Sequence, residues 1–117
     1  IIAVGGGTFF GDPKNLACER YILEQSGRRH PTVCFIPTAS AEPSDYIARF
    51  FEAFTRLGVR PTVLRLFQRT PDLREVLLNH DVIYVGGGNT KSMLAVWREW
   101  GLPDVLREAW RRGIVLS

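Results

Sequence analysis

A run of β-branched and aromatic residues that stops at three glycines places the strongest constraint on the fold of this chain. Val82–Val85 reads VIYV, glycines follow at 86–88, and a helical pattern begins beyond Asn89 and Thr90. This order predicts a buried strand, a tight loop and the first turn of a helix. Glycines let another group come close to the backbone, and the first N–H groups of a helix point back toward the preceding loop. The stretch is therefore suited to hold a negative group, or one that becomes negative during a reaction.

Similar apolar runs alternate with helical patterns along the rest of the chain. Besides 82–85, strands are predicted at 1–4, 32–36, 60–67 and 114–116. Helices are predicted at 12–26, 44–57, 72–78, 91–100 and 103–112. Pro13 suits the first position of the first helix, and Ser44 suits the N-cap of the second. Alternation at this spacing predicts a parallel sheet with helices on both faces, although the strand order stays open.

Four of the predicted helices carry apolar residues spaced to form one inward face. In the first two helices these are Leu16, Tyr21, Ile22 and Leu23, then Ile47, Phe50, Phe51 and Phe54. In the last two they are Met93, Leu94, Trp97 and Trp100, then Val105, Leu106 and Trp110. The three tryptophans, interpreted as core or interface residues, leave an apolar face for a second copy in a homo-oligomer or for further chain.

Length and charge exclude several classes of protein. The chain has 117 residues, which suffices for one domain with one core. Its net charge is +3, but its 13 arginines and 2 lysines are scattered rather than gathered into a stripe, so no nucleic-acid partner is expected. No apolar run approaches the roughly 20 residues that span a bilayer, and no signal sequence opens the chain. No membrane partner is expected either.

The two cysteines favour a reduced, cytoplasmic protein. Cys18 falls in a helical pattern and Cys34 in a strand pattern, and neither has a second cysteine or a histidine at ligand spacing. Neither cysteine therefore predicts a metal site, and burial is the simpler role for both.

The loops after the predicted strands are where chemistry is expected, because open parallel sheets bind ligands beyond the carboxyl ends of their strands. These loops include both glycine triplets of the chain and several hydroxyl groups. They lie at 5–7, 37–40, 66–68, 86–89 and Ser117. In a parallel sheet all five lie along one edge.

Neither triplet matches the two common phosphate-binding motifs. From Gly86 the sequence runs GGGNTK, so that Lys91 stands where the dinucleotide fingerprint needs its third glycine. From Gly5 it runs GGGTFF, and Phe10 stands at that position. The P-loop fails as well, because Asp12 and the proline after it replace the required Lys and Ser or Thr. A nucleotide site remains an alternative, as does a purely structural role for the glycines.

Isolated polar residues give weaker signals. His80 precedes a strand and so lies at the amino edge of the sheet, and His30 lies in an arginine-rich loop. Ser40 follows a strand, but no visible motif places a histidine where it could activate this serine as a nucleophile. We expect Ser40 to be a loop hydroxyl that contacts substrate.

Three segments, taken together and in order, resemble a known family. They read FIPTAS at 35–40, IYVGGGNT at 83–90 and GIVLS at 113–117. They resemble the dipeptidase E (α-aspartyl dipeptidase) and cyanophycinase family of serine peptidases, which has the class I glutamine amidotransferase-like fold. The resemblance implies a three-layer α/β/α, flavodoxin-like fold that is incomplete at its C-terminus. Residues 1–117 would then form the N-terminal portion of a larger catalytic domain.

The resemblance also assigns site residues. In that family the fifth strand leads into a G-x-S-A-G turn, and Ser117 matches the residue immediately before it. The nucleophilic serine is therefore expected just after Ser117, its histidine and acidic partners later still, and the chain alone is expected to be inactive. The resemblance implies an oxyanion-hole donor at Gly88. We also predict substrate-binding residues at Gly87, Asn89, Gly7 and Ser40.

The activity that this resemblance implies is hydrolysis of short peptides, aspartyl dipeptides among them, by a cytoplasmic serine peptidase. Such an enzyme works through an acyl-enzyme and needs no cofactor or metal. Two alternatives stay open: a non-catalytic ligand-binding domain of the same superfamily, and a nucleotide-binding α/β domain. Residues beyond Ser117 would distinguish the first alternative, and thermal shifts with nucleotides the second.

Overall fold

The structure is a computed structural model that describes residues 1–6, 8–9, 11–12 and 14–117. Gly7 and Pro13, which the sequence assigns to substrate binding and to a helix start, lie outside the described residues. The elements in chain order are α1 (Ala17–Glu24), β1 (Val33–Ile36), η1 (Thr38–Ser40), α2 (Ser44–Arg56), β2 (Pro61–Val63), α3 (Leu73–Leu78), β3 (Val82–Val85), α4 (Thr90–Glu99), α5 (Leu102–Arg111) and β4 (Val115–Leu116).

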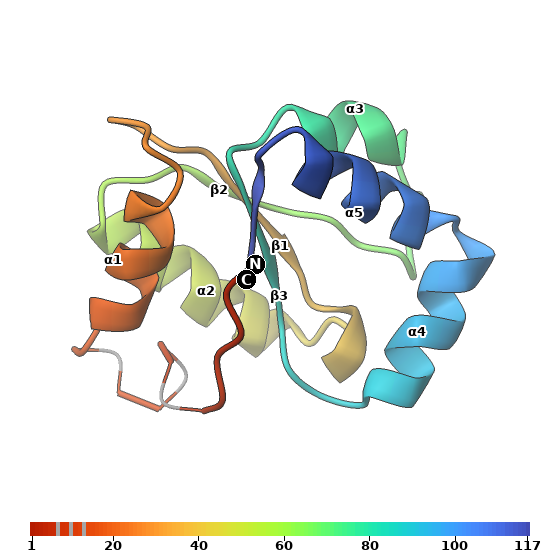
Figure 1. Cartoon of the computed structure of the whole chain (residues 1–117). Coiled ribbons are helices and arrows are strands. Elements are labelled where there is room, and N and C mark those ends of the chain that lie inside the picture. The colour runs from red at the N-terminus through yellow and green to blue at the C-terminus, as the bar shows by residue number, and fades with distance from the viewer. Residues whose placement is uncertain (7, 10, 13) are drawn as a thin grey trace.

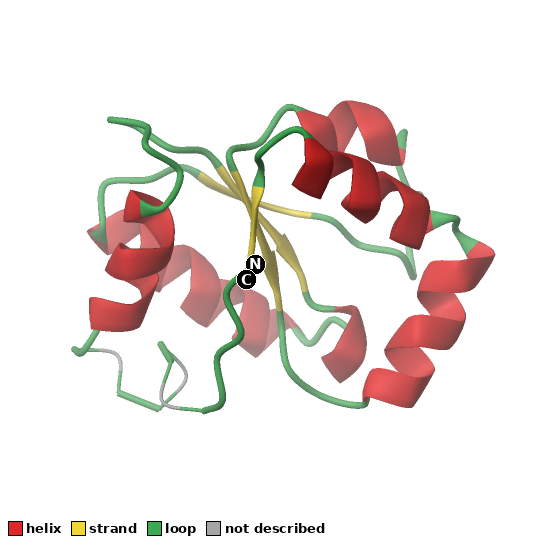
Figure 2. Ribbon diagram, in the orientation of Figure 1, coloured by secondary structure: helices red, strands yellow, loops and turns green. Residues whose placement is uncertain are grey.

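The four strands form one parallel sheet in the order β2-β1-β3-β4. β1 pairs with β2 and β3, and β3 pairs with β4. Figure 1 shows α1 and α2 on one side of this sheet and α3, α4 and α5 on the other. Figure 2 shows the strands as the layer between the helices. The predicted α/β fold with helices on both faces of a parallel sheet is confirmed.

Alternate residues of β1 face two different cores. The ring of Phe35 stacks on that of Phe50 from α2, with centroids 4.1 Å apart, while Ile36 packs into the core on the other face. The first core is rich in aromatic rings, and the second consists mostly of aliphatic residues. A strand covered on both faces needs apolar residues at every position, and all four residues of β1 are buried.

Most predicted elements are confirmed, since β1, β3, β4 and helices α2 to α5 lie within two residues of their expected bounds. The strand predicted at 1–4 is wrong. Among the described residues, the backbone bond that ties this segment to the sheet joins the Ile2 N–H to the Leu116 carbonyl at 2.8 Å. One bond leaves an extended arm beside β4, because a ladder needs bonds repeated along both strands.

The strand predicted at 60–67 is too long. Only Pro61–Val63 pair with β1, and the chain leaves the sheet after the Leu64 N–H has donated to the Phe35 carbonyl. The Leu66 N–H donates instead to the carboxylate of Glu42, which takes the place of a ladder partner. Leu64 and Leu66 are still buried, so their alternation marks a packed turn rather than a strand.

The first helix is shorter than predicted. α1 begins at Ala17 and not at Asp12, whose carboxylate accepts the Lys14 N–H at 2.9 Å in a local turn. Bonds of this kind compete with helix formation. Ser44 is the first residue of α2 rather than its N-cap, because Pro43 holds the cap position.

Three residues predicted to face inward are exposed. Tyr21, Trp100 and Trp110 are 53%, 43% and 54% accessible, whereas Trp97 is buried. Trp97 is fixed because its Nε1–H donates to the Thr38 hydroxyl at 3.1 Å, which ties α4 to η1. The tryptophans therefore comprise one core residue and two surface residues. None of the helices formed by the described residues is both long enough and apolar enough to cross a membrane.

Candidate active-site edge

The loops that follow β1 and β3 are joined at the carboxyl edge of the sheet. The Gly86 N–H donates to the Ile36 carbonyl at 3.0 Å, which extends the ladder by one bond beyond the strands. The Asn89 N–H donates to the Ala39 carbonyl at 2.7 Å, which ties the end of the glycine triplet to η1. The predicted meeting of these two loops is therefore present in the structure.

Gly88 is the most constrained residue of the triplet. Its φ of +145° is a backbone conformation that residues with a side chain rarely adopt. A Cβ atom there would lie 2.2 Å from the Ala39 carbonyl oxygen, far inside van der Waals contact. The Gly88 N–H makes no hydrogen bond with any described residue, and the residue is exposed. An exposed, unused N–H on a fixed backbone is what an oxyanion donor requires.

The other two glycines have different surroundings. A Cβ atom at Gly86 would lie 3.0 Å from the ring of Phe35 and 3.1 Å from the ring of Tyr46. At Gly87 the same atom would meet no atom of the described residues within 4 Å. The triplet thus passes from a ring-lined position through an open one to Gly88, which packs on the backbone of η1.

Asn89 forms the start of α4. Its side-chain oxygen accepts the Ser92 N–H at 3.0 Å, which is the usual bond of an N-cap residue. The cap directs the positive end of the helix dipole at the triplet. Asn89 was predicted to contact substrate. Because its side-chain oxygen accepts the Ser92 N–H, the side-chain nitrogen is the group that can still contact a substrate.

A hollow of about 340 Å³ opens beside the triplet. It is lined by Ser40, Pro43, Asp45, Tyr46 and Gly87. Two predicted substrate-binding residues, Ser40 and Gly87, are thereby brought together. The Ser40 hydroxyl donates to the Pro37 carbonyl at 3.0 Å, so its oxygen meets a ligand in the hollow as an acceptor.

The turn between η1 and α2 has a strained backbone. Ala41 and Glu42 are both left-handed, with φ of 62° and 56°. Such a conformation costs roughly 1–2 kcal/mol for each residue with a side chain, and it recurs at functional sites. The buried carboxylate of Glu42 accepts the Leu66 N–H, which fixes the turn and brings the loop after β2 to the same edge.

Ser117 lies beside β3 at this edge. Its N–H donates to the Ile83 carbonyl at 3.0 Å, and its own carbonyl accepts the Val85 N–H at 2.7 Å. Because Ile83 is the register partner of Leu116, Ser117 falls opposite Tyr84.

Comparison with known proteins gives this edge its family context. Residues 1–117 match the sequence profile of peptidase family S51. The chain belongs to peptidase family S51. The resemblance drawn from the three sequence segments is confirmed at the level of the family.

Two relatives show how far the likeness extends. The Bacillus subtilis (strain 168) protein named uncharacterized peptidase YgaJ is 50% identical over 118 residues, which cover 100% of this chain and 51% of that protein. A 1.5 Å crystal structure of a candidate peptidase E protein from Listeria monocytogenes EGD-e has a TM-score of 0.68 at 27% identity. That match covers 83% of this chain and 50% of the Listeria chain. The present chain spans about half the length of both relatives.

Phe9, which follows the first glycine triplet of this S51 chain, is anchored by a buried carboxylate. The Phe9 N–H donates to Glu19 Oε1 at 2.8 Å, and the Phe9 ring stacks on Tyr46 with centroids 5.6 Å apart. Glu19 lies on α1 and is fully buried, and its second oxygen has no hydrogen-bond partner among the described residues. Burial raises the pKa of Tyr84, the charge of Glu19 raises it further, and a bond with the Thr8 side chain lowers it in part.

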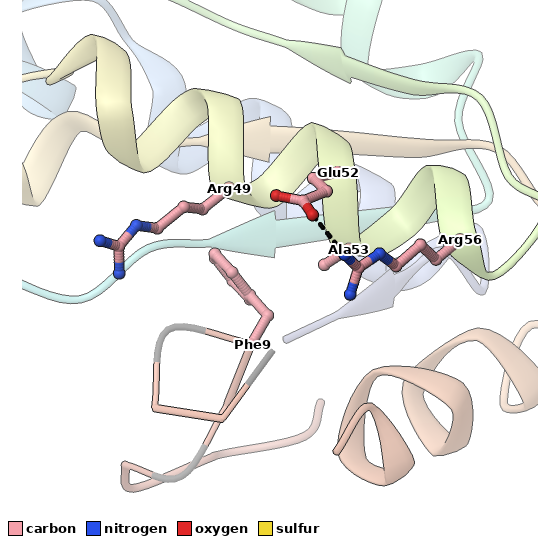
Figure 3. Close-up of a pocket in the computed structure, with 5 residues that line it drawn as sticks. All are labelled: Phe9, Arg49, Glu52, Ala53 and Arg56. Atoms are coloured by element: carbon pink, nitrogen blue, oxygen red, sulfur yellow. Dashed lines mark hydrogen bonds and ion pairs between the residues drawn. The ribbon is translucent and has the colours of Figure 1, made fainter. Parts of the chain in front are cut away.

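A second hollow lies where α2 meets Phe9, and none of the predicted site residues is among the described residues that line it. Figure 3 shows Phe9 and four residues of α2 around a space of about 260 Å³. The residues from α2 are Arg49, Glu52, Ala53 and Arg56. Glu52 and Arg56 form an exposed ion pair one turn apart, and such pairs contribute about 1 kcal/mol or less. This hollow is therefore a weaker candidate for a peptidase active site than the carboxyl edge of the sheet, where the second glycine triplet lies.

The other polar candidates lie away from the carboxyl edge or inside the core. His80 contacts the Thr62 hydroxyl at 2.9 Å, and the Asp81 carboxylate accepts the Thr32 N–H at 2.9 Å. These bonds link the amino ends of the strands, where His80 was predicted to lie. Burial raises the pKa of the Cys34 thiol to about 11, so this cysteine stays neutral and unreactive.

Three residues near the candidate site could not be predicted from sequence patterns: Tyr46, Glu42 and Glu19. A glutamate within a helical pattern normally faces solvent, so nothing in the sequence marks Glu19 as buried. The one signal available for Tyr46 was its place in the first turn of a helix that follows a loop at the carboxyl edge.

Proposed function

We propose that this chain provides the oxyanion loop and part of the substrate site of a serine peptidase that hydrolyses short peptides through an acyl-enzyme. The observation that carries the proposal is the Gly88 N–H. It belongs to an exposed residue at the carboxyl edge, on a backbone that packs on Ala39, and no described residue accepts it. Membership of peptidase family S51 supports the reaction class.

Aspartyl dipeptides are the proposed substrates, in line with the family resemblance. Their contacts in this chain would come from Gly87, Asn89, Ser40 and, outside the described residues, Gly7. The hollow of about 340 Å³ beside Gly87 is large enough for one side chain of such a peptide.

The register of β4 supports the proposed place of the nucleophile. Leu116 pairs with Ile83 in a parallel ladder. If the ladder continued unchanged, the third residue after Ser117 would lie opposite Gly87. A G-x-S-A-G turn directly after Ser117 would have its serine at that third position. The proposed nucleophile and the proposed donor would then belong to neighbouring loops of one sheet edge.

In this reaction the serine oxygen attacks the carbonyl carbon of the peptide, and the carbonyl oxygen gains negative charge. The Gly88 N–H would donate to that oxygen in the tetrahedral intermediate, and the start of α4 would add its dipole. Collapse of the intermediate breaks the bond between carbon and nitrogen, and the leaving amine takes a proton. Water then releases the acyl group from the serine.

The test uses the extended protein, meaning this chain joined to the remaining half of the family domain. Hydrolysis of aspartyl dipeptides is measured, and the 117-residue chain is expected to be inactive alone. Gly88→Val cannot isolate the donor, because a side chain there clashes with Ala39. Replacing the amide between Gly87 and Gly88 by an ester removes the N–H without adding bulk. We expect this ester to lower kcat about 100-fold or more.

The matched control is the same ligated protein with its natural amide. If the extended protein hydrolyses no dipeptide, the proposed activity is wrong. If the ester variant keeps full activity, the role proposed for the Gly88 N–H is wrong.

A further inference from the structure

The short helix η1 supplies the surface on which the second glycine triplet rests. The Ala39 carbonyl accepts the Asn89 N–H at 2.7 Å. A Cβ atom at Gly88 would lie 2.2 Å from the same carbonyl oxygen, so the backbone of Gly88 packs directly on η1. Glycines have more backbone freedom than other residues, so a donor carried by three of them needs a fixed support to stay aimed. The position of η1 therefore decides where the Gly88 N–H points.

A second hydrogen bond joins η1 to the helix that follows the triplet. The Trp97 Nε1–H donates to the Thr38 hydroxyl oxygen at 3.1 Å, and both side chains are buried. Trp97 lies on α4, about two turns beyond the residue that caps this helix. Side chains on a helix point back toward its N-terminus, which lets the indole reach η1 from that distance.

The two bonds hold η1 at two separate points of one rigid helix. The Asn89 N–H holds Ala39 at the start of α4, and Trp97 holds the neighbouring Thr38 from further along. One bond would leave η1 free to rotate about it, whereas two bonds restrain its orientation as well as its position. Because the second bond is buried, water cannot readily replace either partner when it is lost.

The pair acts at a distance from the proposed substrate. Neither Thr38 nor Trp97 is among the described residues that line the hollow beside Gly87. Any effect of the pair on the reaction must therefore pass through the Ala39 carbonyl, on which Gly88 packs.

We infer that Thr38 and Trp97 are positioning residues for the oxyanion donor. Their hydrogen bond fixes η1, and η1 fixes the backbone that carries the Gly88 N–H. The inference rests on the proposed peptidase function, and it gives two buried side chains of the core a role in the reaction.

Thr38→Val tests the pair in the extended protein. Valine keeps the shape of threonine and offers no oxygen to the Trp97 N–H. We expect kcat to fall about fivefold while KM stays within about twofold, because the donor acts on charge that develops in the transition state. Thr38→Ser keeps the hydroxyl and should recover most of kcat. The matched control is Thr62→Val, which removes a threonine hydroxyl that contacts His80 at the amino edge and should leave kcat unchanged.

A double-mutant cycle separates the bond from the two side chains that make it. Trp97→Phe removes the N–H and keeps an aromatic ring, and kcat should again fall about fivefold or more. In the double variant Thr38→Val/Trp97→Phe, kcat should be close to that of Trp97→Phe alone, because the bond can be lost only once. If the two losses multiply, the bond does not carry the effect and the inference is wrong.

Hydrogen exchange of the Asn89 amide is the readout that does not depend on activity. It should be about fivefold faster in Thr38→Val than in the wild type or in Thr62→Val, because the Ala39 carbonyl is held less firmly. Trp97→Phe supplies the same readouts if Thr38→Val does not fold. Unchanged exchange, unchanged kcat, or a change in KM alone would overturn the inference. An inactive wild-type extended protein would overturn the proposed function, and faster Asn89 exchange would then still establish that the pair holds the loop.

Discussion

Two segments of this chain have nearly the same sequence and different structures. Residues 1–8 read IIAVGGGT, and residues 82–90 read VIYVGGGNT. The second forms β3, a tight loop and the start of α4, while in the first the described residues form an arm beside β4. The intrinsic preference for strand structure is almost equal in the two segments, so the difference in structure comes from the residues that surround each of them.

The surroundings act at both ends of the segment. β3 is a strand because it has partners on two sides, β1 and β4. After its triplet, Asn89 caps a helix, whereas after the first triplet the buried ring of Phe9 packs into the aromatic core and α1 begins only at Ala17. The second triplet forms a tight loop at a helix start because neighbouring strands and a cap residue complete it.

The largest effect that separates the two segments is expected at the glycines themselves. Gly88→Ala places a Cβ atom 2.2 Å from the Ala39 carbonyl oxygen at a φ of +145°. We expect the free energy of unfolding to fall by about 4 kcal/mol. Gly6→Ala adds strain at a φ of +71° but meets no described atom within 4 Å, so a loss of about 1 kcal/mol is expected. Urea unfolding measures both, and equal losses would contradict the importance of packing on Ala39.

The first segment is expected to depend most on Phe9, the residue that directly follows it. Its ring is 2% accessible and packs among the aromatic side chains of the first core. Phe9→Ala should lower the free energy of unfolding by about 3 kcal/mol, because a large buried side chain is lost. Phe67→Ala is the control at a ring that is 54% accessible, and it should cost less than about 1 kcal/mol. If both variants melt at the same temperature, Phe9 does not anchor the segment.

A pH-dependent effect should distinguish Tyr84 from Ala3, which holds the corresponding place in the first segment. Burial and the charge of Glu19 raise the pKa of Tyr84, so the folded state keeps its phenol neutral where an unfolded chain ionises. Stability should fall as pH rises above about 10, by up to about 1.4 kcal/mol per pH unit for this group. Tyr84→Phe should reduce that slope between pH values of about 10 and 11. If the stability of Tyr84→Phe falls with pH as steeply as that of the wild type, other groups cause the loss of stability.

The smallest effect is expected at the asparagines that lie before α4 and α1. Asn89→Ala removes the N-cap bond to the Ser92 N–H and should destabilise the protein by about 1 kcal/mol. Asn15→Ala removes an exposed 3.3 Å bond to the Ala17 N–H and should cost less than about 0.5 kcal/mol. Asn89→Asp should restore most of the loss. Failure of this rescue would mean that the Asn89 side chain has a role other than capping.

The fold could be predicted where local pattern and tertiary structure agree. The buried run at β1, the amphipathic helix α2 and the strand before the second triplet all carry their signals within a few residues. The predictions that were wrong depend on partners. Residues 1–4 have the composition of a strand, but within the described part of the chain one backbone bond, to Leu116, ties them to the sheet. Residues 60–67 leave the sheet because the Glu42 carboxylate accepts the Leu66 N–H.

The candidate site could be predicted only as a meeting of loops. The ends of parallel strands share an edge, which was enough to bring Ser40 and Gly87 together. Contacts between residues far apart in the sequence could not be predicted, and these give Tyr46 and Glu19 their places. No periodicity records that a ring on α2 stacks on Phe9, or that a glutamate on α1 turns inward to accept a backbone N–H.

The hydrogen bond between Ile2 and Leu116 has a consequence for the order of folding. It joins residues from opposite ends of the sequence, and Figure 1 shows the two termini side by side. Closing a longer loop costs more chain entropy, and contacts of long sequence separation slow folding. The arm that carries the first triplet should therefore dock after the sheet has formed and detach before the sheet unfolds, with faster amide exchange at Ile2 than at Ile83.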